Sequence, residues 1–114
     1  MKQALLNVLN SFGFPVFLQG TLGDNEPFPA SFFTFFTIDS PDAYPFDNSP
    51  TKTAYEVQVI FYSNDPLKVE QYANQSRTAL KAAGFIPQGK GRDIPSDEIT
   101  HTGWLCEYYY LTDY

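Results

Sequence analysis

The clearest apolar and polar pattern in the chain is a strand followed by a helix, in residues 53–85. From Tyr55 to Tyr62, one set of alternate positions is entirely aromatic or β-branched, and the other set includes Glu56 and Gln58. A period of two residues is typical of a half-buried strand. The sequence therefore predicts a β-strand over residues 55–62.

A helix is predicted directly after this strand. The Asp65 carboxylate can accept hydrogen bonds from the first helical turn, and Pro66 suits a position whose N–H has no partner. Gly84 is expected to end the helix as its left-handed C′ residue, with Phe85 folding back as the apolar contact. Residues at steps of three and four are expected to face the sheet. They are Val69, Tyr72, Ala73, Ser76, Leu80 and Ala83.

Four further elements follow from the same periodicities. An apolar stripe predicts a helix over Lys2–Phe12, and alternation predicts strands over Val16–Leu18, Ser31–Ile38 and Thr102–Leu111. Both faces of the strand Ser31–Ile38 are apolar, so it needs cover on both sides, from its own chain or from a neighbouring subunit. The expected fold is a single α+β domain over residues 1–114, in which a mainly antiparallel sheet of about four strands packs against two helices.

Two long loops are predicted between these elements, over Asp39–Lys52 and Pro87–Glu98. The first contains three prolines and three aspartates, too many for regular structure. It also displays Tyr44 and Phe46, which a solvated linker would not need. Because these residue types anchor interfaces once buried, the loop is a candidate contact with a partner. The alternative is that both rings pack on the sheet of the same subunit.

Composition narrows the possible partners and compartments. A net charge of −6, with only seven Lys and Arg residues, argues against a surface that binds nucleic acid. Cys106 is the only cysteine, so no internal disulfide is possible and an intracellular setting is expected. No apolar run approaches the roughly 20 residues that cross a bilayer, and the N-terminal stretch lacks the features of a signal peptide.

No catalytic, cofactor or metal site emerges from the motifs. His101 and Cys106 could form a nucleophile pair, but if the strand begins as early as His101 the two residues lie on opposite faces of it. The three aspartates of the loop over residues 39–52 lack the spacing of a calcium loop. The Gly89–Gly91 run lacks the setting of a phosphate loop, so a flexible turn is expected there.

The order of motifs over residues 31–111 resembles the small minor tail proteins of long-tailed bacteriophages and prophages, a group similar to tail-terminator and tail-completion proteins. The positions that show the resemblance are Phe46-Asp47-Asn48, the strand Tyr55–Ser63, Ala83-Gly84-Phe85 and His101.

The resemblance implies a non-enzymatic structural subunit of the virion tail, assembled in the bacterial cytoplasm without a cofactor. Its copies would form a homo-oligomeric ring, commonly a hexamer, that stops growth of the tail tube and takes part in head–tail joining. The partners would be the tail-tube protein and the head connector, and DNA would pass through the ring without specific binding. The expected interface residues are Tyr44, Phe46, Asp47, Asn48, Phe32, Phe36 and Tyr109.

Other functions stay open at this stage. The protein could be a head-completion or connector protein, or another minor tail component. A monomeric protein-binding module would show no assembly that depends on concentration. An enzyme would have a cleft with perturbed ionisable groups around His101, Cys106 or Glu107.

Overall fold

The computed structural model describes residues 2–18, 29–38, 52–95 and 100–113. They form an α+β fold with two helices and a six-stranded, mostly antiparallel sheet. The elements in chain order are α1 (Lys2–Asn10), β1 (Val16–Leu18), β2 (Ser31–Ile38), β3 (Lys52–Ser63), α2 (Pro66–Ala82), β4 (Ile86–Pro87), β5 (Arg92–Pro95) and β6 (Thr102–Asp113). The fold class is confirmed, but the expected number of about four strands is too low.

The two additional strands are β4 and β5, which occupy part of the predicted loop Pro87–Glu98. The sheet order is β1-β2-β3-β6-β4. Strand β5 pairs with the same edge of β6 as β4 does, but nearer the start of β6. Among the described strands, only β1 and β2 run parallel. Because β4 and β5 have two and four residues, they show no periodicity of their own and are stabilised by pairing with β6.

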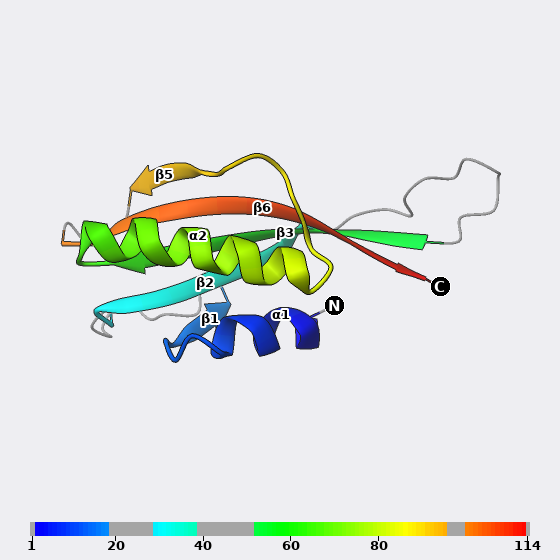
Figure 1. The fold of residues 1–114 in the computed structure, drawn as a ribbon, viewed down its shortest axis with the longest axis horizontal. Helices are drawn as coiled ribbons and strands as arrows, with labels where there is room; N and C mark the ends of the chain where they lie inside the picture. The colour runs from blue at the N-terminus through cyan, green and yellow to red at the C-terminus, as the bar shows by residue number, and fades with distance from the viewer. Residues whose placement is uncertain (1, 19–28, 39–51, 96–99, 114) are drawn as a thin grey trace.

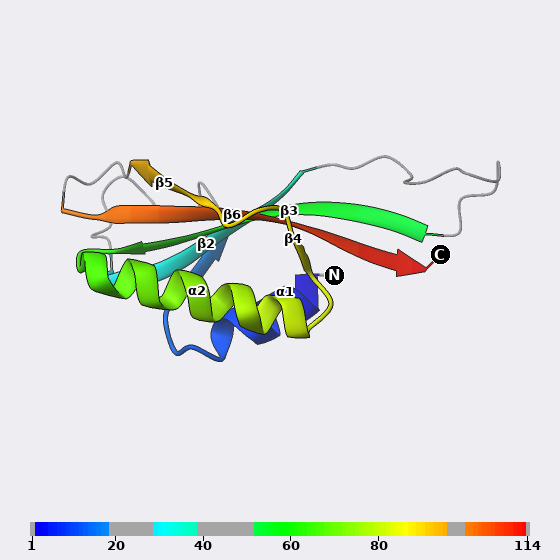
Figure 2. The ribbon, with the colours of Figure 1, turned by 45° about the horizontal axis from the view of Figure 1, so that its top comes forward.

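Both helices lie on one side of the sheet (Figure 2), and the core lies between them and that face. Aromatic rings fill much of it: Phe14 lies 4.8 Å from Tyr72, and Phe33 lies 4.8 Å from Phe61, between ring centroids. Helix α1 ends at Asn10 rather than at Phe12, because the Gly13 N–H bonds to the Asn10 carbonyl in a turn. The buried cluster is Leu5, Leu9, Phe33, Phe35, Val57, Val59, Phe61, Val69, Leu80, Phe85, Cys106 and Tyr108.

Both predicted ends of α2 are confirmed. Asp65 Oδ1 accepts from the Leu67 N–H at 3.0 Å. At the other end the Phe85 N–H bonds to the Leu80 carbonyl, and Gly84 has a φ of +99°. This hydrogen bond and the positive φ belong to a Schellman ending, in which Phe85 returns to the core.

The helix face toward the sheet is also largely as predicted. Val69, Ala73, Ser76 and Leu80 are buried, whereas Ala83 is exposed. Ala83 was expected to face the sheet, but it is the C-cap residue, and the chain turns away at Gly84.

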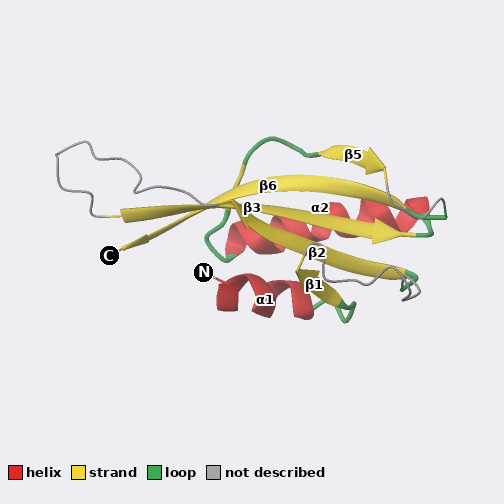
Figure 3. Ribbon diagram, turned by 180° about the vertical axis from the view of Figure 1, so that it is seen from behind, coloured by secondary structure: helices red, strands yellow, loops and turns green. Residues whose placement is uncertain are grey.

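The second face of the sheet, turned toward the viewer in Figure 3, is buried over β2 within the single chain. Phe32 is 1% exposed and Thr34 is 7% exposed. The Phe32 ring packs on Tyr62 and Phe17, with centroid distances of 5.1 and 5.8 Å. The chain itself therefore covers these two residues of β2, and Phe36 on the same face is half-buried.

A two-stranded arm extends the sheet beyond the helices (Figure 1). Strand β2 ends where Ile38 lies opposite Glu56, whereas β3 continues back to Lys52, opposite Asp113 of β6. We define the arm as residues 52–55 and 110–113. The expectation that Lys52 belongs to a loop is wrong, since pairing with β6 starts at that residue; the rest of that predicted loop, 39–51, lies outside the described residues.

Candidate functional site

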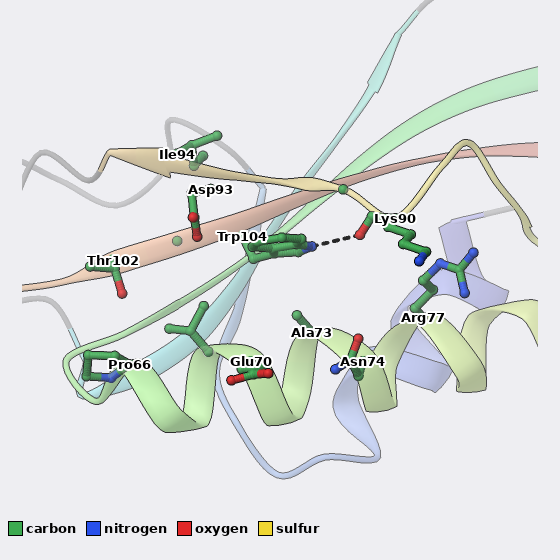
Figure 4. A pocket seen from close by; sticks show the side chains of 13 residues that line it. Pro66, Glu70, Ala73, Asn74, Arg77, Lys90, Asp93, Ile94, Thr102 and Trp104 are labelled. Atoms are coloured by element: carbon green, nitrogen blue, oxygen red, sulfur yellow. Dashed lines mark hydrogen bonds between the residues drawn. The ribbon is translucent and has the colours of Figure 1, made fainter.

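A groove of about 1130 Å³ runs between α2 and β5, on the side of the sheet that the helices cover (Figure 4). Strand β5 pairs with the first residues of β6, from Thr102 to Leu105. It forms one wall of the groove. Helix α2 contributes residues from Pro66 to Arg77 to the other wall. The turn between β4 and β5 adds Lys90 and Gly91 at one end.

The Trp104 ring is the centre of this groove. It projects from β6 into the space between α2 and β5 and is half-buried (Figure 4). Its Nε1–H donates to the Lys90 carbonyl at 3.0 Å. Gly91 has a φ of +91°, and a Cβ at this position would collide with the Trp104 ring and the Leu105 carbonyl. Glycine is therefore required for the turn to close over the indole.

The charged residues of the groove are separated along its length. Arg77 and Lys90 lie together at one end, whereas Glu70 and Asp93 lie nearer the end formed by Pro66 (Figure 4). Arg77 Nε donates to the Gly89 carbonyl at 3.3 Å, which ties α2 to the turn. Within the part of the chain that the structure describes, none of these four charged side chains forms an ion pair.

The lining of the groove offers both apolar and charged surface to a ligand. Its surface combines the half-buried ring of Trp104 and small or apolar side chains of α2, such as Ala73 and Val69, with separated charges. An extended peptide offers the matching features, namely backbone polar groups, apolar side chains at intervals and charges at fixed spacing. Among residues 2–18, 29–38, 52–95 and 100–113, no group of three or more His, Cys, Asp or Glu side chains could hold a metal ion.

The predicted interface residues do not belong to this groove. Tyr44, Phe46, Asp47 and Asn48 lie outside the described residues. The other three lie on the opposite face of the sheet. Phe32 lies opposite Tyr62 in the register of β2 and β3. Phe36 and Tyr109 are half-buried and lie nearer the arm. Phe32 lies about 13 Å along the strand from Phe36, at about 3.3 Å per residue, so the three form no single cluster.

His101 and Cys106 lie on opposite sides of the sheet, as predicted. The His101 ring is 6.1 Å from Phe32, and Nε2 is 2.8 Å from the Pro29 carbonyl, to which it must donate. Nδ1 lies 2.9 Å from the Thr100 hydroxyl, so in the neutral imidazole it accepts from that group. Cys106 is 5% exposed and belongs to the core beneath the helices. The two residues therefore cannot act as a nucleophile and its base.

Tyr108 is the one described residue with a strongly shifted pKa. Burial raises the pKa of its phenol well above the usual value near 10, and the neighbouring Cys106 thiol raises it further. The Cys106 sulfur does not meet the geometry of a hydrogen bond, and the phenol oxygen has no hydrogen-bond partner among the described residues. Tyr108 is fully covered, so the group is structural rather than a reactive site.

Sequence reasoning missed the groove because its parts are distant in the chain. The Gly89–Gly91 run was predicted to be a turn, and both glycines have positive φ angles. Its contact with Trp104, fourteen residues after Lys90, is a product of β5 pairing with β6. A lysine between two glycines, followed by the only tryptophan, was the available signal.

No family model matches the sequence, and no curated protein matches it at a significant level. The described helices do not include one with the length and apolar character needed to span a membrane.

Proposed function

We propose that this protein is a structural subunit of a bacteriophage or prophage tail: a tail terminator or tail-completion protein. Its copies form a ring, with six as the expected number, that caps the tail tube and contributes to head–tail joining. The tail-tube protein and the head connector are its partners in the virion tail, after assembly in the bacterial cytoplasm. The proposal includes neither a catalytic step nor a cofactor.

The observation that carries this proposal is the arm. A two-stranded ribbon is marginally stable in water by itself. Residues 52–55 of β3 do not pair with β2, and residues 110–113 of β6 do not pair with β4. Within the described chain, both strands of the arm therefore have an unpaired outer edge. Such edges accept strands or side chains from a neighbouring subunit.

The charge of the protein supports the same proposal. A net charge of −6 would repel DNA, which suits a ring through which DNA slides. Ring closure also requires two different contact surfaces on each copy. The arm and the groove are two such surfaces, on different parts of the sheet (Figures 1 and 4).

Two alternatives remain. The protein could instead be a head-completion or connector protein, or another minor tail component. A monomeric protein-binding module is favoured by the groove, which has the mixed apolar and charged lining of a peptide site.

Light scattering over a range of concentrations, together with electron microscopy of tail tubes, tests the proposal. We expect the mass to rise to that of a closed ring, and tubes formed with the protein to have uniform lengths and a cap at one end. A protein that stays monomeric and leaves tube length unchanged would contradict the proposal and favour the binding module.

A matched pair of arm variants links assembly to the arm. Thr53 lies opposite Thr112 in the register of β3 and β6. Thr53→Asp with Thr112→Asp places like charges across the arm and should weaken assembly, whereas Thr53→Asp with Thr112→Lys places opposite charges there and should assemble as the parent does. Equal assembly by both variants would show that the arm is not a contact.

A further inference from the structure

We propose that the groove between α2 and β5 binds residues 39–51 of a second copy of this chain. The inference rests on the self-association proposed above and names its receptor surface. The residues that line the groove all lie within the described ranges.

The chemistry of the segment complements that of the groove. Residues 39–51, `DSPDAYPFDNSPT`, contain three aspartates, three prolines, Tyr44 and Phe46, and no lysine or arginine. Arg77 and Lys90 form no ion pair among the described residues, so their charges are available to carboxylates. Aromatic and proline rings pack well on an indole face such as that of Trp104. Prolines also limit the conformational freedom that binding removes.

The separation of charges in the groove sets the direction of the segment. Asp39 and Asp42 lie in the first part of the segment, Asp47 follows Phe46 in the middle, and Asn48–Thr51 carry no charge. Placing the first part at Arg77 and Lys90 puts the aromatic residues over Trp104. The uncharged part then lies beside Glu70 and Asp93, where a further carboxylate would be repelled.

The segment of the same chain is too short to lie in its own groove. Trp104 is opposite Phe61 on β3, nine residues from Lys52, and Ile38 is opposite Glu56. At about 3.3 Å per residue, a path from Ile38 to Trp104 and back to Lys52 covers about 46 Å along the strands alone. A fully extended chain between Ile38 and Lys52 spans about 50 Å at most. It would also have to leave the plane of the sheet and follow the groove, so residues 39–51 can occupy the groove only from another copy.

The only tryptophan of the protein provides a direct assay, because it lies in the groove. A synthetic peptide of residues 39–51, with both ends blocked, is titrated into the full-length protein at a concentration where the protein is monomeric. We expect a saturable change in Trp104 fluorescence. A peptide with Tyr44→Ser and Phe46→Ser should bind at least about tenfold more weakly, since aromatic anchors dominate such interfaces.

Two sets of groove variants test the charges. Lys90→Gln changes an exposed residue and should weaken peptide binding about tenfold, as expected for the loss of a charged hydrogen bond. Glu70→Gln with Asp93→Asn is the matched control, and it should bind the peptide as tightly as the parent or more tightly. Unchanged melting temperatures show that each variant remains folded. If Lys90→Gln binds as the parent does, or the control weakens binding as much, the charge assignment is wrong.

The outcome for the segment is separable from the outcome for the proposed function. If the peptide leaves Trp104 fluorescence unchanged while the protein caps tubes, the groove assignment is overturned and the proposed function stands. If the peptide binds but tubes remain uncapped, the groove assignment stands and the tail function fails. A scrambled peptide of the same composition that binds equally well would overturn the assignment to a second copy in favour of any acidic aromatic partner.

Discussion

Replacing Tyr108 by Phe should stabilise the protein, although it removes a polar group from a well-packed core. Tyr108 is fully buried, and its ring lies 6.4 Å from Phe85 in an edge arrangement. The substitution keeps the ring and deletes only the hydroxyl. That hydroxyl has no hydrogen-bond partner among the described residues. On folding it therefore loses its hydrogen bonds to water and gains none in return.

The expected gain follows from the cost of an unsatisfied buried group. Such a group costs about 1–3 kcal/mol, so we expect Tyr108→Phe to raise the free energy of unfolding by about 1–2 kcal/mol at pH 7. For a domain of this size, the increase corresponds to about 3–8 °C in melting temperature. Tyr109→Phe is the matched control, because its side chain is only half-buried, and its change should stay within about 0.5 kcal/mol.

The pH dependence provides a second measurement of the same phenol. Burial raises the pKa of Tyr108 in the folded protein, so the unfolded chain releases this proton first, near pH 10. Below that pH the contribution of Tyr108 to stability is constant. Above pH 10 the folded state is disfavoured by about 1.4 kcal/mol for each pH unit, up to the raised pKa. The Phe variant lacks this loss, so its advantage should widen by about 1.4 kcal/mol between pH 9 and 11.

Urea unfolding at pH 7, 9 and 11, followed by circular dichroism, measures all of these quantities. A Phe variant that is less stable than the parent by 1 kcal/mol or more would refute the reasoning, because the phenol must then have a partner such as a bound water. A constant difference between the two proteins from pH 9 to 11 would show that the phenol ionises as easily in the folded protein as in the unfolded chain.

Two local changes have smaller, separable effects. Asp65→Ala should lower the free energy of unfolding by about 1 kcal/mol through loss of the 3.0 Å hydrogen bond to the Leu67 N–H, and coincident melting curves would show that this cap contributes nothing. Gly91→Ala should cost more than Gly89→Ala in thermal melts and should also change Trp104 fluorescence. Both glycines have positive φ angles, and placing alanine at such an angle costs about 1–2 kcal/mol at either position. Only at Gly91 would the added Cβ also collide with Trp104. Equal losses would exclude a role for the contact between the turn and the indole.

The long, regular elements could be predicted from the sequence because their signals are local. Helix α2 was predicted with both ends, since Asp65, Pro66 and Gly84 act on backbone groups within one turn of themselves. The strands β2, β3 and β6 were predicted from alternation, which reports which side of each strand is buried. The same alternation correctly predicted that His101 and Cys106 lie on opposite faces of the sheet.

The short strands, the arm and the groove were decided by tertiary structure. The `RDIP` run of β5 has no pattern of its own and is a strand because the edge of β6 is available to it. Lys52 belongs to a strand because Asp113 lies opposite it, sixty-one residues later in the chain. The groove requires α2, the glycine turn and Trp104 to meet, and no local pattern encodes a contact between three separate segments. Local periodicity thus determined which faces are buried, whereas pairing between distant strands determined the surfaces that a partner would meet.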